Sequence, residues 1–461
     1  MNIDVLVADD SAFLRKSISD ILKKNEFINN VDFAKDGKET INLIRIHRPD
    51  VLVLDLVMPK MNGLDAFKII MKDHPTPTII LSAISPKNLD SSVQALLMGA
   101  FDYIIKPGGI GAKDLPRFRK ELLAKVLLAS QSQIKRIFRK EKKSLTKKTT
   151  IRQEIVNEIF DFGQYLNRLK PIEEVDKINE YNFTFKAKPK EFFNEKSKKG
   201  NLPKLDAISK WKSNLNRKKA QELISIPNNI EKISTLENIG SLKTTSLIPD
   251  HKLTSTNFAE FTSDNNVNLI SNIIVIGASV GGPRTITTIL KDIPSDFSAP
   301  ILVVQHLSSH FTDAFAENLD LECKLKIKVS NHGEILKSGI GYIAPGEKHM
   351  EVSVEKKTPC IKLKKGSPVN FCMPSIDVLF FSAAKLYKNR CLGILLTGMG
   401  SDGVEGLHAI KKVGGKTIAE SEQTSILYAM PKFAAEKGYA DLVLSNYQIS
   451  EEMIKFIKNS K

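Results

Sequence analysis

Residues 272–282 read NIIVIGASVGG, a run of β-branched residues that passes directly into a loop of glycine and serine. Two other segments repeat this arrangement: Pro300–Val304 leads into Gln305-His306, and Cys391–Leu396 leads into Thr397–Gly403. Each apolar run has the length and composition of a buried parallel strand. Open α/β sheets place their functional residues just past the carboxyl ends of such strands. The three segments therefore predict one parallel sheet whose edge carries a serine, a histidine and a carboxylate.

The three side chains are Ser279, His306 and Asp402, the equipment of an acyl-transfer site. A serine hydroxyl barely ionises at neutral pH, so Ser279 needs a base. His306 accepts its proton at Nε2 if Nδ1–H is held by a carboxylate, and Asp402 is placed to be that carboxylate. The backbone N–H groups around Gly398-Met399-Gly400 offer an oxyanion hole.

The residues alone leave competing assignments. Residues 277–281 match the pattern G-x-S-x-G, but the chain order serine, histidine, aspartate differs from the order of α/β-hydrolases, so the pattern does not indicate that fold. His332 and His349 compete for the role of base, and Glu405 competes for that of the acid.

Polar residues also follow the strands predicted near the N-terminus. These strands are Ile3–Ala8, Val51–Leu54, Thr78–Leu81 and Tyr103–Ile105, and they end at Asp9-Asp10, Asp55, Ser82 and Lys106-Pro107. Clustered carboxylates repel one another, and a magnesium ion would relieve that repulsion while leaving positions for phosphate. With a hydroxyl and an ammonium beside the carboxylates, the cluster predicts a phosphoryl-accepting site. Helix capping is the alternative for any single one of these acids.

Residues 123–268 differ in character from both ends of the chain. Residues 131–270 hold 27 Lys and Arg against 17 Asp and Glu, so they carry +10 of the net charge of +16. We expect a long basic linker, partly helical or disordered, in which residues 151–169 have the apolar spacing of an amphipathic helix. Because the excess charge lies outside the motif-bearing ends, nucleic acid is not the expected partner.

Residues 1–122 resemble the receiver domain of two-component response regulators. The matching segments are Asp9-Asp10, residues 55–63 (DLVMPKMNG), residues 81–83 and Gly99–Tyr103 with Lys106-Pro107. The resemblance implies that Asp55 takes phosphate from a histidine kinase and that Asp9, Asp10 and Asp55 hold Mg²⁺. It also implies that Ser82 and Lys106 contact the phosphoryl group, and that Tyr103 is the aromatic residue that changes rotamer on activation.

In the C-terminal domain expected at residues 269–461, residues from about 271 to 450 resemble the catalytic domain of CheB-type chemotaxis protein-glutamate methylesterases. Besides the three opening segments, the matching ones are Ala344–Gly346 with His349, Ser367–Phe371 with Pro374–Asp377, residues 414–417 and Met430-Pro431. The resemblance implies that Ser279 is the nucleophile, His306 the base, Asp402 its orienting acid and Met399 the oxyanion donor. The implied activity is hydrolysis of glutamate γ-methyl esters on chemoreceptors with release of methanol, together with deamidation of receptor glutamines. No cofactor is implied for the esterase.

The expected fold class is α/β: an N-terminal doubly wound receiver domain (flavodoxin-like) and a C-terminal doubly wound parallel-sheet methylesterase domain. We see no signal peptide and no apolar run near the ~20 residues that span a bilayer, which predicts a cytoplasmic protein without membrane insertion. The four cysteines lack metal-ligand spacing and are expected to be reduced. The alternative from another class is a non-catalytic response regulator with a basic binding region.

Overall fold

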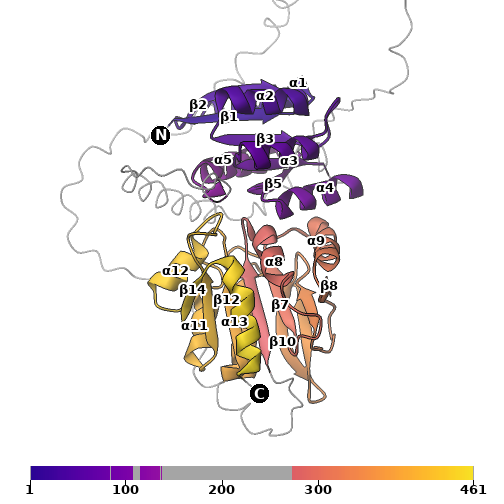
Figure 1. Cartoon of the computed structure of the whole chain (residues 1–461), viewed down its shortest axis with the longest axis vertical. Coiled ribbons are helices and arrows are strands. Elements are labelled where there is room, and N and C mark those ends of the chain that lie inside the picture. The colour runs from indigo at the N-terminus through magenta and orange to yellow at the C-terminus, as the bar shows by residue number, and fades with distance from the viewer. Residues whose placement is uncertain (1, 84, 107–114, 135–136, 138–271, 460–461) are drawn as a thin grey trace, which may run out of the picture. The chain divides into compact units, whose positions relative to one another are not determined.

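The computed structural model describes residues 2–83, 85–106, 115–134, 137 and 272–459 (Figure 1). The predicted helix at 151–169 and nearly all of the predicted linker lie outside these residues. The described residues at both ends of the chain belong to one compact unit, built on two parallel sheets. No helix within the described ranges is long and apolar enough to cross a membrane.

The N-terminal domain is a five-stranded parallel sheet in the order β2-β1-β3-β4-β5, which is the flavodoxin-like order. Its strands are β1 (Ile3–Ala8), β2 (Ile28–Ala34), β3 (Val51–Asp55), β4 (Thr78–Ser82) and β5 (Asp102–Ile105). Its helices are α1 (Ala12–Leu22), α2 (Gly37–His47), α3 (Gly63–Asp73), α4 (Pro86–Leu97) and α5 (Leu115–Ser130). Helices α1 and α5 cover one face of the sheet, and α2, α3 and α4 lie together on the other. The fold class predicted for this domain is confirmed.

Short polar side chains begin the helices of this domain. Ser11, Asp36 and Asn62 each accept a hydrogen bond from a backbone N–H in the first turn of α1, α2 and α3. The turn before α3 also needs Gly63, because a Cβ there would lie 2.0 Å from the carbonyl oxygen of Asp55. The chain after β3 therefore folds back tightly over the residue that ends the strand.

The end predicted for the N-terminal domain, residue 122, lies in the middle of α5. This helix continues to Ser130, because Leu122, Val126 and Ala129 are fully buried at helical spacing. Gln133 and Ile134 beyond it are also buried. The N-terminal domain thus extends past the predicted start of the linker.

The C-terminal domain is a seven-stranded sheet in the order β14-β13-β12-β6-β7-β9-β8, and all its pairings are parallel. The central strands are β6 (Ile273–Ala278), β7 (Ile301–Gln305) and β12 (Cys391–Leu395). The outer strands are β8 (Lys326–Val329), β9 (Ile340–Ile343), β13 (Lys416–Glu420) and β14 (Leu442–Leu444). The three strands predicted from the opening segments are therefore adjacent, and their bounds differ from the prediction by one or two residues.

Helices cover both faces of this sheet. The helices are α8 (Gly282–Leu290), α9 (Ser309–Glu322), α10 (Ile376–Tyr387), α11 (Val404–Lys412), α12 (Met430–Glu436) and α13 (Asn446–Lys458), with a short 3₁₀ turn, η4, at Lys388–Arg390. Helices α8, α9 and α13 pack together on one face, and α10, α11 and α12 on the other. The predicted fold class is confirmed here too. An antiparallel hairpin of β10 (His349–Glu355) and β11 (Thr358–Lys364), which the sequence analysis did not predict, packs against α10.

Candidate phosphoacceptor and active sites

The carboxyl ends of β1, β3 and β5 bring Asp9, Asp55 and Lys106 together. Lys106 Nζ lies 2.8 Å from Asp9 Oδ2 and 2.6 Å from Asp55 Oδ2. Asp10 completes a group of three acids whose oxygens lie within 4.8 Å of one another. Ser82, at the end of β4, is buried and bonded through its hydroxyl to Ser92. The predicted residues therefore converge at one edge of the sheet.

The charges in this cluster depend on one another. Burial raises the pKa of Asp55, and the Lys106 ammonium opposes that rise. For Lys106, burial alone would lower the pKa, but the carboxylates of Asp55 and Asp9 outweigh it and the pKa is raised. The lysine is therefore a fixed cation against which an anionic group on Asp55 can be held.

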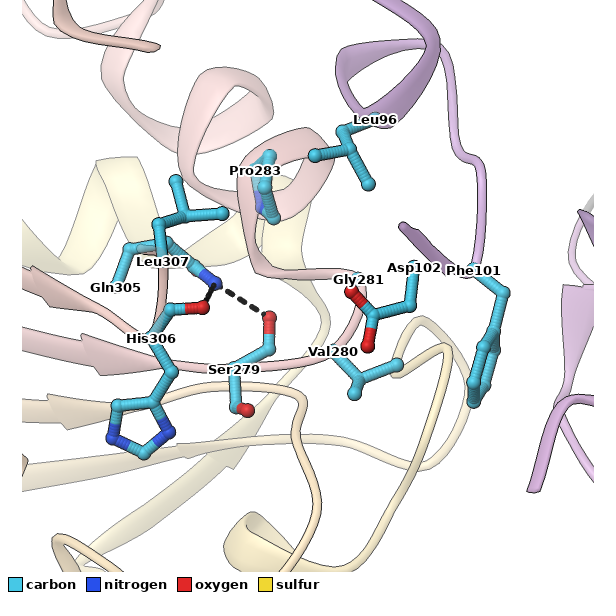
Figure 2. A pocket seen from close by; sticks show the side chains of 10 residues that line it. All are labelled: Leu96, Phe101, Asp102, Ser279, Val280, Gly281, Pro283, Gln305, His306 and Leu307. Carbon is cyan, nitrogen blue, oxygen red and sulfur yellow. Dashed lines mark hydrogen bonds between the residues drawn. The ribbon is translucent and has the colours of Figure 1, made fainter. Parts of the chain in front are cut away.

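The loop after β6, which carries Ser279, is hydrogen-bonded to residues that follow or end both neighbouring strands. The Ser279 N–H donates to the carbonyl oxygen of Thr397, after β12, at 3.0 Å. Gln305 Nε2, at the end of β7, donates to the Ser279 carbonyl oxygen at 2.8 Å (Figure 2). Gly398 permits this close approach, because a Cβ at that position would lie 2.6 Å from Cβ of Ser279. The loop geometry thus fixes the serine at the centre of the strand edge.

His306 and Asp402 form the predicted pair, but through the other ring nitrogen. His306 Nε2 donates to Asp402 Oδ2 at 2.9 Å. The prediction that the carboxylate holds Nδ1 is therefore wrong, because Asp402 reaches the ring from the far side of β6, on the β12 loop. Ser279 and His306 line one pocket (Figure 2). Nδ1 is then the nitrogen left to accept the serine proton.

Ser279 and His306 are not hydrogen-bonded to each other in the described part of the chain. Such contacts are often long before substrate binds and tighten in the reacting complex.

Asp402 is held by a set of donors that fix its orientation. Its side chain is 2% exposed and accepts from Ser375 Oγ at 2.7 Å, Ile376 N–H at 2.6 Å and Asn370 Nδ2 at 3.0 Å, besides His306. Burial would raise the pKa of Asp402, but His306 and these donors outweigh it and lower the pKa. Asp402 is therefore a stable anion that stabilises a positive charge on the imidazole.

The competing assignments are not supported by the geometry. His349 places both ring nitrogens on backbone groups, the carbonyl oxygen of Ser367 and the N–H of Ser375. His332 bonds to the backbone of Leu363, and Glu405 pairs with Lys437 at the surface. None of these three reaches the pocket of Ser279.

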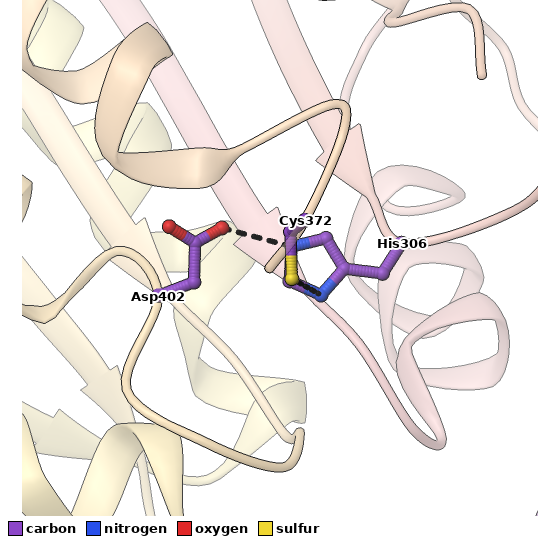
Figure 3. Close-up of side chains that lie close together, drawn as sticks. All are labelled: His306, Cys372 and Asp402. Atoms are coloured by element: carbon purple, nitrogen blue, oxygen red, sulfur yellow. Dashed lines mark hydrogen bonds and ion pairs between the residues drawn. The ribbon is translucent and has the colours of Figure 1, made fainter. Parts of the chain in front are cut away.

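Cys372 contacts Nδ1 of His306, the ring nitrogen assigned above to accept the proton of Ser279. Its Sγ is 3.5 Å from His306 Nδ1, so the imidazole sits between a thiol and the carboxylate of Asp402 (Figure 3). Burial alone would lower the pKa of His306, but Cys372 and Asp402 outweigh it and raise the pKa to about 10. The sequence analysis gave Cys372 no role, because nothing in the local pattern places it next to a histidine 66 positions away.

Two buried acids near the triad were also missed. Asp377 accepts from Gly406 N–H and shares Asn370 with Asp402, and burial together with the Asp402 charge raises its pKa to about 6. Glu420, fully buried at the end of β13, accepts from the N–H of Thr397 at 2.8 Å, and burial raises its pKa to about 7. Glu420 thereby supports the loop that carries Met399. The N–H of Gly398 donates to the carbonyl oxygen of Leu427. The N–H of Met399 makes no hydrogen bond within the described residues.

A receiver-like phosphoacceptor site and a serine–histidine–aspartate site on an α/β sheet define a response-regulator hydrolase. Comparisons with known proteins agree with this class. The receiver profile, "Response regulator receiver domain", matches residues 5–113, and the profile "CheB methylesterase" matches residues 274–453.

Full-length relatives carry one common name, "Protein-glutamate methylesterase/protein-glutamine glutaminase". The relative from Pyrococcus horikoshii is 30% identical over 99% of this chain and 94% of its own, and the one from Desulfitobacterium hafniense is 32% identical over 99% and 98%. A crystal structure of the Thermotoga maritima CheB methylesterase catalytic domain is 40% identical and covers 40% of this chain and 97% of its own, with a TM-score of 0.39. The chain belongs to the family of CheB-type protein-glutamate methylesterases/protein-glutamine glutaminases.

Proposed function

We propose that this protein hydrolyses glutamate γ-methyl esters on chemoreceptors and deamidates particular receptor glutamines, under the control of phosphorylation at Asp55. The observation that carries the proposal is the 2.9 Å bond between His306 and Asp402 in a pocket shared with Ser279. That pairing is the apparatus of nucleophilic acyl transfer. Membership of the family supplies the substrate class. A histidine kinase is the expected phosphodonor.

Each triad residue has one task in this mechanism. The Ser279 hydroxyl attacks the ester carbonyl while His306 Nδ1 takes its proton, and Asp402 stabilises the imidazolium through Nε2–H. The Met399 N–H donates to the oxyanion that forms. The imidazolium then protonates the leaving methanol, or ammonia in deamidation, and water releases the glutamate by the same steps.

The acids of the N-terminal site fit a magnesium ion. Asp9, Asp10 and Asp55 offer hard carboxylate oxygens within 4.8 Å of one another, which is the ligand chemistry that Mg²⁺ prefers. A bound ion would offset the negative charge of phosphate arriving at Asp55. We expect Ser82 and Lys106, at the ends of neighbouring strands, to contact the phosphoryl oxygens.

The N-terminal domain also touches the catalytic pocket. Leu96, Phe101 and Asp102 line it together with Ser279 (Figure 2), and the Tyr103 hydroxyl accepts from the N–H of Ser308 at 3.1 Å. The Tyr103 ring packs against Phe311 with 3.9 Å between ring centroids. Tyr103 lies on β5, three residues before Lys106. A change in the position of Lys106 on phosphorylation can therefore alter the contacts of Tyr103 with Ser308 and Phe311. In this arrangement the receiver restricts access to the serine.

Phosphorylation should therefore raise the rate of methanol release. We expect a small acyl phosphate to increase release from methylated receptor membranes by roughly 5- to 150-fold, the usual range of coupling between two sites. Asp55→Asn should abolish the increase, and the exposed control Asp20→Asn should retain it. Release that does not respond to the phosphodonor would contradict receiver control. No release or deamidation under any condition would contradict the proposed activity itself.

The position of Cys372 predicts an unusual pH profile. The reaction needs neutral His306, so its rate should rise with pH through the pKa of the base, which is raised to about 10. Cys372→Ala removes a group that raises this pKa, so the acidic limb of kcat/KM should move down by about one to three pH units. The matched control is Cys323→Ala, on another part of the domain. An unmoved limb in Cys372→Ala would show that the thiol does not set the charge of the base.

A further inference from the structure

The contact between Cys372 and His306 has no role in the esterase mechanism. The thiol lies 3.5 Å from the base nitrogen that must serve Ser279, and Asp402 holds the opposite nitrogen. Cys372 is half-buried, and the preceding residue, Phe371, is 67% exposed. The thiol is therefore partly accessible to a small reagent.

This arrangement activates a thiol. An imidazole within hydrogen-bonding reach takes the thiol proton, and the thiolate that results is the nucleophilic form of cysteine. Asp402 is bonded to the opposite ring nitrogen and stabilises the imidazolium that forms when Nδ1 takes a proton. Cys372, His306 and Asp402 thus repeat, with sulfur in place of oxygen, the relay that Ser279 uses.

The other three cysteines of the chain lack such a partner among the described residues. Burial raises the pKa of Cys323 to about 12, and it also raises the pKa values of Cys360 and Cys391. A thiol with a raised pKa has less thiolate at neutral pH and reacts more slowly. The other three cysteines therefore serve as internal controls, and Cys323 matches Cys372 in its partial exposure.

We infer that Cys372 is a modification site at which small peroxides oxidise the thiol and switch the esterase off. The thiolate sulfur attacks one peroxide oxygen, an S–O bond forms and the O–O bond breaks. The sulfur is oxidised by two electrons to sulfenic acid, and the peroxide is reduced to water with the proton that His306 gives up. The reaction consumes one thiolate, one imidazolium and one hydrogen peroxide, and yields one sulfenic acid, one neutral imidazole and one water.

The consequence for the esterase follows from the position of the new hydroxyl. A sulfenic acid at Cys372 places an O–H donor next to His306 Nδ1, the nitrogen that otherwise accepts the proton of Ser279. The O–H of the sulfenic acid is a stronger donor than the thiol S–H that it replaces, so it competes with Ser279 for Nδ1. Because general-base catalysis contributes about 10²- to 10⁴-fold, fully oxidised protein should keep about 1% or less of its rate. A dithiol reductant should restore the rate, since sulfenic acids are reversible.

The test treats the full-length protein with hydrogen peroxide and follows two readouts. The first is mass-spectrometric mapping after trapping with a cyclic dione that adds to sulfenic acids. The second is methanol release, normalised to the untreated rate of each variant. We expect the dione adduct on Cys372 and a parallel loss of activity in wild type and in Cys323→Ala, with Cys372→Ala keeping its own rate.

The outcomes separate this inference from the proposed function on which its regulatory part rests. The dione adduct is mapped without substrate. The experiment therefore identifies the reactive thiol even if the protein releases no methanol. An adduct mainly on Cys323, or equal loss of activity in Cys372→Ala, would overturn the inference. So would full trapping of Cys372 without loss of activity.

Discussion

Ser279→Ala should lower kcat for methanol release by about 10⁶-fold, the size of effect that follows removal of the nucleophile from a serine triad. The loss should be this large because the residue contributes the bond that forms in the reaction, and no neighbouring hydroxyl shares its position. The bonds of residue 279 to Thr397 and Gln305 are made by its backbone, so alanine should keep the loop in place while it removes the nucleophile. KM should change little, because alanine leaves the walls of the pocket in place.

The control for this variant is Ser295→Ala, an exposed serine in the loop before β7. It should retain the rate of the wild type. Phosphorylation of Asp55 by the acyl phosphate should be normal in Ser279→Ala, which would show that the receiver remains folded. A residual rate above a few per cent in Ser279→Ala would mean that another group attacks the ester.

The strand ends could be predicted from the sequence because they depend on local signals. A run such as Ile273–Ile276 identifies a buried strand by composition, and the glycines after it mark the turn. Parallel strands then bring their carboxyl ends to one edge. For the same reason the residues that meet at the phosphoacceptor site, Asp9, Asp55 and Lys106, could be identified before the fold was known.

Contacts set by loops could not be predicted in the same way. The direction of the His306 ring depends on where the loop of Asp402 crosses the sheet edge, and the sequence carries no signal for that. Cys372 meets His306 because residues 365–375 fold back from the β10–β11 hairpin toward α10, and the hairpin itself was not predicted. The end of α5 was missed because its last turns are amphipathic and merge with the basic segment that follows.

Asp402→Asn should lower kcat by about 10⁴-fold, the size of effect seen when a triad carboxylate becomes an amide that holds the wrong tautomer of the histidine. In this site the amide can meet His306 Nε2–H either with its oxygen or with its NH₂ group. The oxygen at position Oδ2 would keep the bond to His306 but turn the NH₂ toward Ser375 and Asn370, which both donate to Oδ1. The opposite orientation would set the NH₂ against Nε2–H and force the proton onto Nδ1, where the base must be empty.

Stability should also fall in this variant, because the amide NH₂ meets a buried donor in either orientation. These donors are Ser375 and Asn370 at the Oδ1 position and the N–H of Ile376 at the Oδ2 position. An unmet buried donor costs about 1–3 kcal/mol, so thermal unfolding should shift to lower temperature while the folded fraction at 25 °C stays high. Glu405→Gln is the matched control, since Glu405 was the competing acid in the sequence and the structure pairs it with Lys437 at the surface. It should keep both activity and stability. If Glu405→Gln lost activity and Asp402→Asn kept it, the orienting carboxylate would be Glu405, and the geometry of His306 described above would not be that of the active enzyme.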